Sequence, residues 1–99
     1  MWQKVARLSE IPEGTCKTIQ CAGPVFGIFN VGGKIYALDN TCPHRGAPLG
    51  DGTLDGGEVI CPWHAWTFDV KTGECKTAPD LKQKTYPVKI EKDDILVDF

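Results

Sequence analysis

The stretch from residue 41 to residue 57 constrains the fold of this 99-residue chain more than any other part. It is rich in glycine and proline, has no helical or alternating period and carries few apolar residues. Such a segment buries too little apolar surface to offset the entropy of ordering its backbone. Because long irregular stretches inside compact domains are uncommon unless they are functional, we expect a bound group rather than a core to hold this one.

Short β-strands are predicted on both sides of this stretch. They are expected over residues 2–8, 15–21, 25–30, 34–39, 58–60, 67–70, 86–90 and 95–99. Val31-Gly32-Gly33 predicts a hairpin turn between two of them, and residues 91–94 predict another. No segment has helix periodicity. The sequence therefore predicts an all-β fold, a small antiparallel β-sandwich or barrel with one irregular insertion.

The composition leaves room for one small domain, residues 1–99, and favours a soluble protein. The net charge is −2 and no basic stripe is present, so a nucleic-acid partner is not expected. No apolar stretch is long enough for a signal peptide or a membrane span, so we expect no membrane partner and a cytoplasmic location. Five cysteines cannot all pair within one chain. In a reducing compartment, those beside histidines are better interpreted as metal ligands.

Both histidines of the chain lie just after a Cys-Pro pair, on either side of the glycine-rich stretch. Cys42-Pro43-His44 and Cys61-Pro62-Trp63-His64 give the pattern C-x-H, sixteen residues, C-x-x-H. Two thiolates and two imidazoles form a four-ligand set for a soft or borderline metal. Each proline fixes φ and stiffens the turn that presents the sulfur. The pattern predicts a metal centre held by Cys42, His44, Cys61 and His64.

The segments CPHRGAPLGDG and CPWHAWTFD resemble those of Rieske ferredoxins and of the Rieske domains of aromatic-ring dioxygenase systems, and the resemblance covers nearly the whole chain. It implies the Rieske fold, with a cluster-binding subdomain of loops and short strands at residues 40–68. It also implies one [2Fe–2S] cluster per chain, with Cys42 and Cys61 on one iron and His44 and His64 on the other. Pro79 and its loop are expected to shield the cluster.

A zinc site is the sharper alternative for these four residues. Classical zinc fingers place a pair of cysteines before a pair of histidines, whereas the order here alternates between the two residue types. The alternation and the flanking resemblance favour the cluster over zinc. The three remaining cysteines, Cys16, Cys21 and Cys75, have no nearby histidine and are interpreted as packing or surface thiols.

The residues flanking the expected ligands predict a low reduction potential. By the resemblance, high-potential Rieske proteins carry an extra cysteine in each ligand loop, and a serine and a tyrosine that hydrogen-bond the cluster and its ligand sulfurs. Here Trp63, Trp66 and Phe68 occupy three of those positions. With fewer donors to the sulfurs, we expect a potential at the low end of the Rieske range, about −150 mV.

The function expected from this reading is one-electron transport rather than catalysis. The chain has no room for a mononuclear iron domain and shows no glycine-rich nucleotide-binding unit. We expect a carrier that takes electrons from a flavin reductase and passes them to an oxygenase or other oxidase. Two alternatives stay open: a small subunit of a larger redox enzyme, resembling that of assimilatory nitrite reductase, and a structural zinc domain.

Overall fold

A computed structural model describes residues 1–20, 24–41, 48–62 and 66–99 of the chain. Within these residues the chain forms short β-strands and two 3-10 turns, and every strand pair is antiparallel. The elements are β1 (Trp2–Arg7), η1 (Leu8–Glu10), β2 (Cys16–Gln20), β3 (Val25–Val31), β4 (Lys34–Asp39), η2 (Leu49–Asp51), β5 (Thr53–Asp55), β6 (Glu58–Ile60), β7 (Thr67–Asp69), β8 (Thr85–Tyr86), β9 (Val88–Glu91) and β10 (Asp94–Asp98). The predicted all-β fold is confirmed.

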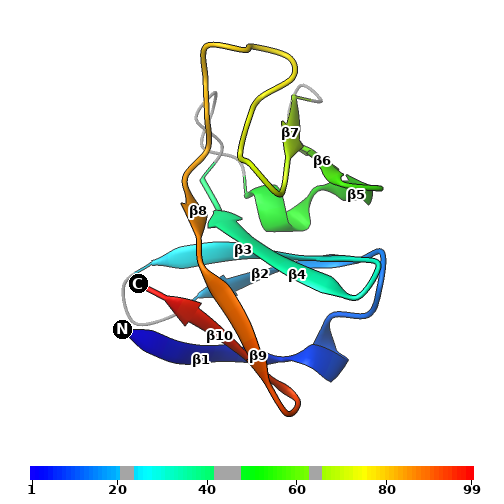
Figure 1. The fold of residues 1–99 in the computed structure, drawn as a ribbon. Helices are drawn as coiled ribbons and strands as arrows, with labels where there is room; N and C mark the ends of the chain where they lie inside the picture. Colours follow the sequence, from blue (N-terminus) through cyan, green and yellow to red (C-terminus); the bar gives the residue numbers. More distant parts are fainter. Residues whose placement is uncertain (21–23, 42–47, 63–65) are drawn as a thin grey trace.

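The strands form three sheets with the orders β1-β10-β9, β2-β3-β4-β8 and β5-β6-β7. Figure 1 shows the β5-β6-β7 sheet above the other two, with both chain termini together in the lower part of the molecule. The amino group of Met1 bonds the Asp98 carboxylate at 2.5 Å and the carbonyl oxygen of Phe99 at 3.1 Å. In the described part of the chain, no helix is long and apolar enough to cross a membrane.

The β2-β3-β4-β8 sheet is covered on both faces. Phe26 and Ile28 of β3 belong to a core shared with Ile95 and Val97 of β10, whereas Phe29 belongs to a second core. That second core contains Phe29, Leu38, Leu49, Val59, Cys61, Phe68, Val70 and Cys75. It joins the β5-β6-β7 sheet to β3 and β4. The other two sheets, β1-β10-β9 and β2-β3-β4-β8, are called the base of the molecule below. Burial on both faces explains why β3 is a nearly continuous apolar run rather than an alternating one.

Both predicted hairpins are present. Gly32 and Gly33 have φ of 60° and 94° between β3 and β4, the positive values that a tight two-residue hairpin turn requires. Lys92 has φ 58° in the turn between β9 and β10. The two hairpins fix the register of the base sheets, in which Phe29 pairs with Tyr36 and Ile95 with Ile90.

The expectation that residues 41–57 lack regular structure is wrong for part of the stretch. Residues 49–51 form η2 and residues 53–55 form β5, which pairs with β6. Leu49 is fully buried in the second core, and Leu54 packs against that core. Burial of Leu49, packing of Leu54 and pairing of β5 with β6 therefore hold residues 49–55, although their composition predicts a loop.

Candidate metal centre

One of the four predicted ligands lies within the described residues. Cys61 follows β6, and its side chain is 2% exposed in the second core. Cys42, His44 and His64 lie outside the described residues. The structure does describe the residues at which both predicted ligand segments begin and end. We call residues 41–48 the first segment and residues 61–66 the second segment.

The two ends of the first segment are held together. Thr41 and Pro48 form an antiparallel bridge. Just outside it, the Leu49 backbone N–H donates to the carbonyl oxygen of Asn40 at 2.8 Å, and the Gly50 N–H donates to Asn40 Oδ1 at 2.7 Å. In the sequence, Cys42 therefore directly follows a residue that is held in place, the bridge residue Thr41.

Asn40 anchors these ends to the base of the molecule. It is 4% exposed, and its backbone N–H donates to the carbonyl oxygen of Val25 at 3.0 Å. A Cβ on Gly50 would lie 2.7 Å from the backbone nitrogen of Thr18, so this approach of η2 to β2 requires glycine. The residues on either side of the first segment are thus held by contacts with β2 and β3.

The second segment is closed in the same way, by the β6-β7 hairpin. The Cys61 N–H donates to the carbonyl oxygen of Trp66 at 2.7 Å, and Ile60 pairs with Thr67 in the sheet. Leu49, beside the first segment, and Cys61, in the second, belong to the same buried core. The fold therefore brings the ends of the two predicted ligand segments together, although the segments are separate in the sequence.

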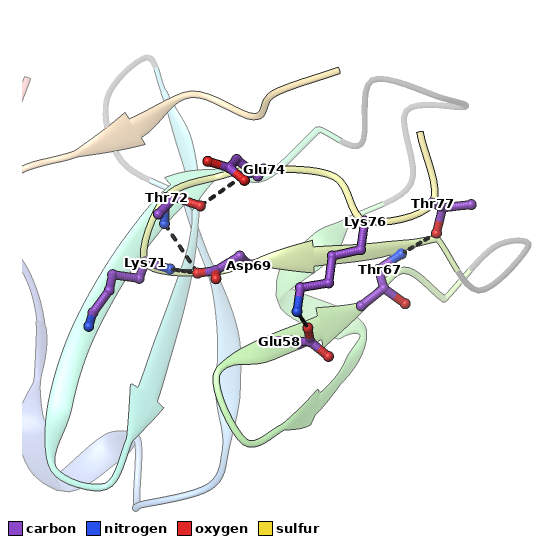
Figure 2. Close-up of polar contacts among 8 residues, drawn as sticks. All are labelled: Glu58, Thr67, Asp69, Lys71, Thr72, Glu74, Lys76 and Thr77. Carbon is purple, nitrogen blue, oxygen red and sulfur yellow. Dashed lines mark hydrogen bonds and ion pairs between the residues drawn. The ribbon is translucent and has the colours of Figure 1, made fainter. Parts of the chain in front are cut away.

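The proline loop, residues 77–81, is bonded to β7. Lys76 N–H donates to the carbonyl oxygen of Thr67 at 2.8 Å, and the Thr67 N–H donates to Thr77 Oγ1 at 3.1 Å. The Lys76 ammonium also pairs with the carboxylate of Glu58 on β6, as Figure 2 shows. These contacts hold the loop beside the strand that follows the second segment. Shielding of the cluster by Pro79 stays a prediction.

A tight turn connects β7 to the proline loop. Asp69 Oδ1 accepts from the backbone N–H groups of Lys71 at 2.8 Å and of Thr72 at 3.2 Å, and Thr72 Oγ1 accepts from the Glu74 N–H at 3.2 Å (Figure 2). Side-chain acceptors of this kind fix turns without a regular backbone ladder. The turn aims the chain back toward β7.

Two of the remaining cysteines lie in packed surroundings, as the sequence predicts. Burial raises the pKa of the Cys16 thiol, and the Asp51 carboxylate raises that pKa further. Cys75 is 2% exposed, and its sulfur accepts from the Ala78 N–H at 3.3 Å. Cys16, Cys61 and Cys75 form no disulfide with one another. Cys21 lies outside the described residues.

The side chains near the predicted centre fit an iron–sulfur group. Thiolates and imidazoles are the donors that Rieske irons take. Cys61 is 2% exposed in an apolar core that also contains Leu49 and Phe68, so its sulfur is shielded from water, which suits a soft ligand. Among the described residues, no group of three histidine, cysteine or acidic side chains forms a competing metal site.

Sequence reasoning missed the residues that hold the first segment in place. Asn40 and Leu49 flank it, but neither belongs to the ligand pattern. An asparagine at the end of a predicted strand is most often a turn residue, so no sequence signal marked Asn40 as buried. Leu49 was the only large apolar residue between residues 41 and 53, and that isolation was the one available hint.

Comparison with known proteins gives full-length similarities. The family model of the Rieske [2Fe–2S] domain matches residues 1–89. The ferredoxin component of the naphthalene 1,2-dioxygenase system from Pseudomonas aeruginosa is 43% identical, over 99% of this chain and 95% of that protein. The solved structure of Sphingomonas yanoikuyae B1 ferredoxin has a TM-score of 0.92 at 32% identity, covering 100% of this chain and 99% of that one. A chain in the complex of reduced oxygenase and oxidized ferredoxin of carbazole 1,9a-dioxygenase has a TM-score of 0.88 at 32% identity, covering 97% and 91%.

Proposed function

Because this chain belongs to the Rieske [2Fe–2S] domain family, we propose that it is the one-electron carrier, or ferredoxin, of an aromatic-ring dioxygenase system. The observation that carries the proposal is its match to such ferredoxin components along nearly the full length of both chains. Full coverage favours the free carrier over the alternative of a subunit of a larger redox enzyme. Membership of this family also argues against the structural zinc domain, because a Rieske domain holds a [2Fe–2S] cluster.

The cluster is held, in this proposal, by the four residues that the sequence pattern selects. Cys42 and Cys61 bind one iron, and His44 and His64 bind the other, within a cluster-binding subdomain at residues 40–68 of a single domain. The closed ends of the first and second segments support the assignment, since they start both segments from one buried core. When bound, the cluster supplies one-electron redox chemistry; the protein holds it and limits its contact with water.

The proposed potential is low, about −150 mV. Phe68 supports it, because its ring is fully buried in the core around Cys61 and has no hydroxyl to donate to a sulfur. A measured midpoint potential near +300 mV would contradict this part of the proposal.

The proposed partners are a flavin reductase upstream and an oxygenase or other oxidase downstream, with no nucleic acid and no membrane. An oxygenase partner is supported by the ferredoxin–oxygenase complexes of carbazole 1,9a-dioxygenase. We propose the cytoplasm as the compartment, because the cluster needs reduced cysteines.

Electron transfer through the purified holoprotein tests the function. A flavin reductase of a dioxygenase system, supplied with a reduced nicotinamide as electron donor, should bleach the visible absorbance of the cluster, and the partner oxygenase with its aromatic substrate and O2 should restore it. Cys42→Ser should abolish both steps, and Cys16→Ser, which alters a thiol outside the ligand set, should keep them. Constant association with a large reductase subunit through purification would instead favour the enzyme-subunit alternative.

A further inference from the structure

Gln83 is a buried polar side chain that the electron-carrier function does not itself explain. It lies between the proline loop and β8 and is 7% exposed. A buried amide is costly unless its hydrogen-bonding groups find partners. The identity of those partners shows which parts of the molecule Gln83 connects.

The side chain of Gln83 donates hydrogen bonds to the backbone at the start of the first segment. Its Nε2 lies 2.6 Å from the carbonyl oxygen of Asp39 and 2.6 Å from that of Thr41. Asp39 ends β4, and Thr41 directly precedes Cys42. Both N–H groups of one amide are therefore used to hold two backbone carbonyls of the residues that lead into the first ligand-bearing segment.

The backbone of Gln83 is fixed by the turn after β7. Its N–H donates to the carbonyl oxygen of Gly73 at 2.7 Å. Gly73 has φ 82°, and a Cβ at this position would lie 2.1 Å from the carbonyl oxygen of Gln83, so only glycine permits this approach. Gln83 thereby connects the turn after β7, the strand that follows the second segment, to the start of the first segment.

We propose that Gln83 is a positioning residue for the cluster: it fixes residues 39–41, which lead into the first segment, relative to β7, which follows the second segment. This inference rests on the proposed ligand set. The amide suits the role because it has two donors at one atom. A carboxylate would face two carbonyl oxygens with like partial charge, and a thioether would leave both carbonyls without this donor.

The test compares holoproteins carrying Gln83→Met and Gln83→Glu with wild type. Gln3→Met, at an exposed position of β1, is the matched control. Hydrogen exchange is followed by mass spectrometry in peptides covering residues 39–50 and residues 88–98. Visible circular dichroism of the cluster and the rate at which cluster absorbance is lost at elevated temperature are measured on the same samples.

Removing the two hydrogen bonds should speed exchange in residues 39–50 about tenfold and leave residues 88–98 unchanged. The cluster should be lost about tenfold faster, with an altered visible circular dichroism spectrum, and Gln3→Met should match wild type in every measurement. Should Gln83→Met not accumulate as holoprotein, Gln83→Asn, which keeps the amide but shortens its reach, provides the comparison.

Equal acceleration in both peptides with an unchanged cluster spectrum would reduce Gln83 to an ordinary contributor to stability and overturn the proposal, as would unchanged exchange in residues 39–50. Failure of the proposed function is a separate result. A wild-type protein that binds no iron and sulfide would contradict the carrier function, whereas the exchange of residues 39–50 reports on Gln83 alone.

Discussion

Replacing Gly73 by alanine should destabilise the protein far more than the same change at Gly14. The two glycines have nearly the same backbone angle, with φ of 82° and 80°. They differ in the space around the missing Cβ: nothing lies within 4 Å at Gly14, whereas the Gln83 carbonyl oxygen lies 2.1 Å away at Gly73. The pair therefore separates backbone strain from the close contact between the turn after β7 and Gln83.

The magnitude follows from these two terms. A positive φ costs an alanine about 1–2 kcal/mol, and the stiffer unfolded chain returns about 0.4–1 kcal/mol, so Gly14→Ala should lose about 1 kcal/mol. At Gly73 the Gln83 carbonyl must also retreat by 0.9 Å, from 2.1 Å to the 3.0 Å below which real Cβ contacts are essentially never found. Overpacking of this kind costs a further 1–3 kcal/mol or so, which brings the loss for Gly73→Ala to about 3 kcal/mol.

Thermal unfolding of the two holoproteins, followed by far-ultraviolet circular dichroism, measures the difference. A gap of about 2 kcal/mol corresponds to about 8–16 °C in Tm for a domain of this size. Gly73→Ala should also lose cluster absorbance earlier in the scan, since the shifted carbonyl displaces Gln83 from the first segment. Midpoints within about 3 °C of each other would refute the reasoning and show that the turn adapts without cost.

Three further predictions concern a core leucine, a half-buried thiol and an exposed carboxylate. Leu49→Ala should cost about 2–5 kcal/mol in urea unfolding and weaken cluster retention, because Leu49 is fully buried in the core that contains Cys61; the control Ile90→Ala, at a 40% exposed position, should cost far less. Alkylation of Cys16 by iodoacetamide, quantified by mass spectrometry, should rise at higher pH than for a free cysteine because burial raises the pKa of this thiol; a profile matching free cysteine would contradict this. The Arg7 N–H lowers the pKa of Glu10, so this carboxylate stabilises the fold above its ordinary pKa and less as the pH falls through the lowered value. Glu10→Gln should therefore be less stable than wild type at neutral pH and equal to it in strong acid, and a difference independent of pH would count against this origin.

The sequence predicted the strands better than it predicted what they surround. Val25 to Asn30 was recognisable as a strand from its β-branched and aromatic residues, but not as a strand buried on both faces. Burial on the second face arises from β5, β6 and β7, which are distant in the chain. β5 itself was missed because Thr53-Leu54-Asp55 has one apolar residue, and its order comes from pairing with β6.

The proposed ligand residues could be selected from the sequence because metal chemistry restricts both their types and their spacing, and their assignment stays a prediction. The residues that hold the ligand segments could not be selected in this way, because they act through long-range contacts with backbone atoms. Gln83 bonds Asp39 across 44 positions of the chain and Thr41 across 42. A glutamine in a polar stretch carries no pattern that indicates such a role, and only the folded arrangement reveals it.

Nitrogen coupling in the reduced holoprotein tests the central claim most directly. The chain has two histidines, His44 and His64, so protein grown with ¹⁵N-histidine carries the label at these two residues alone. Pulsed electron paramagnetic resonance of the reduced cluster should then detect strong ¹⁵N couplings from two imidazoles, and His64→Cys should remove one of them. A paramagnetic cluster with no histidine coupling, or colourless protein that contains zinc, would contradict the account.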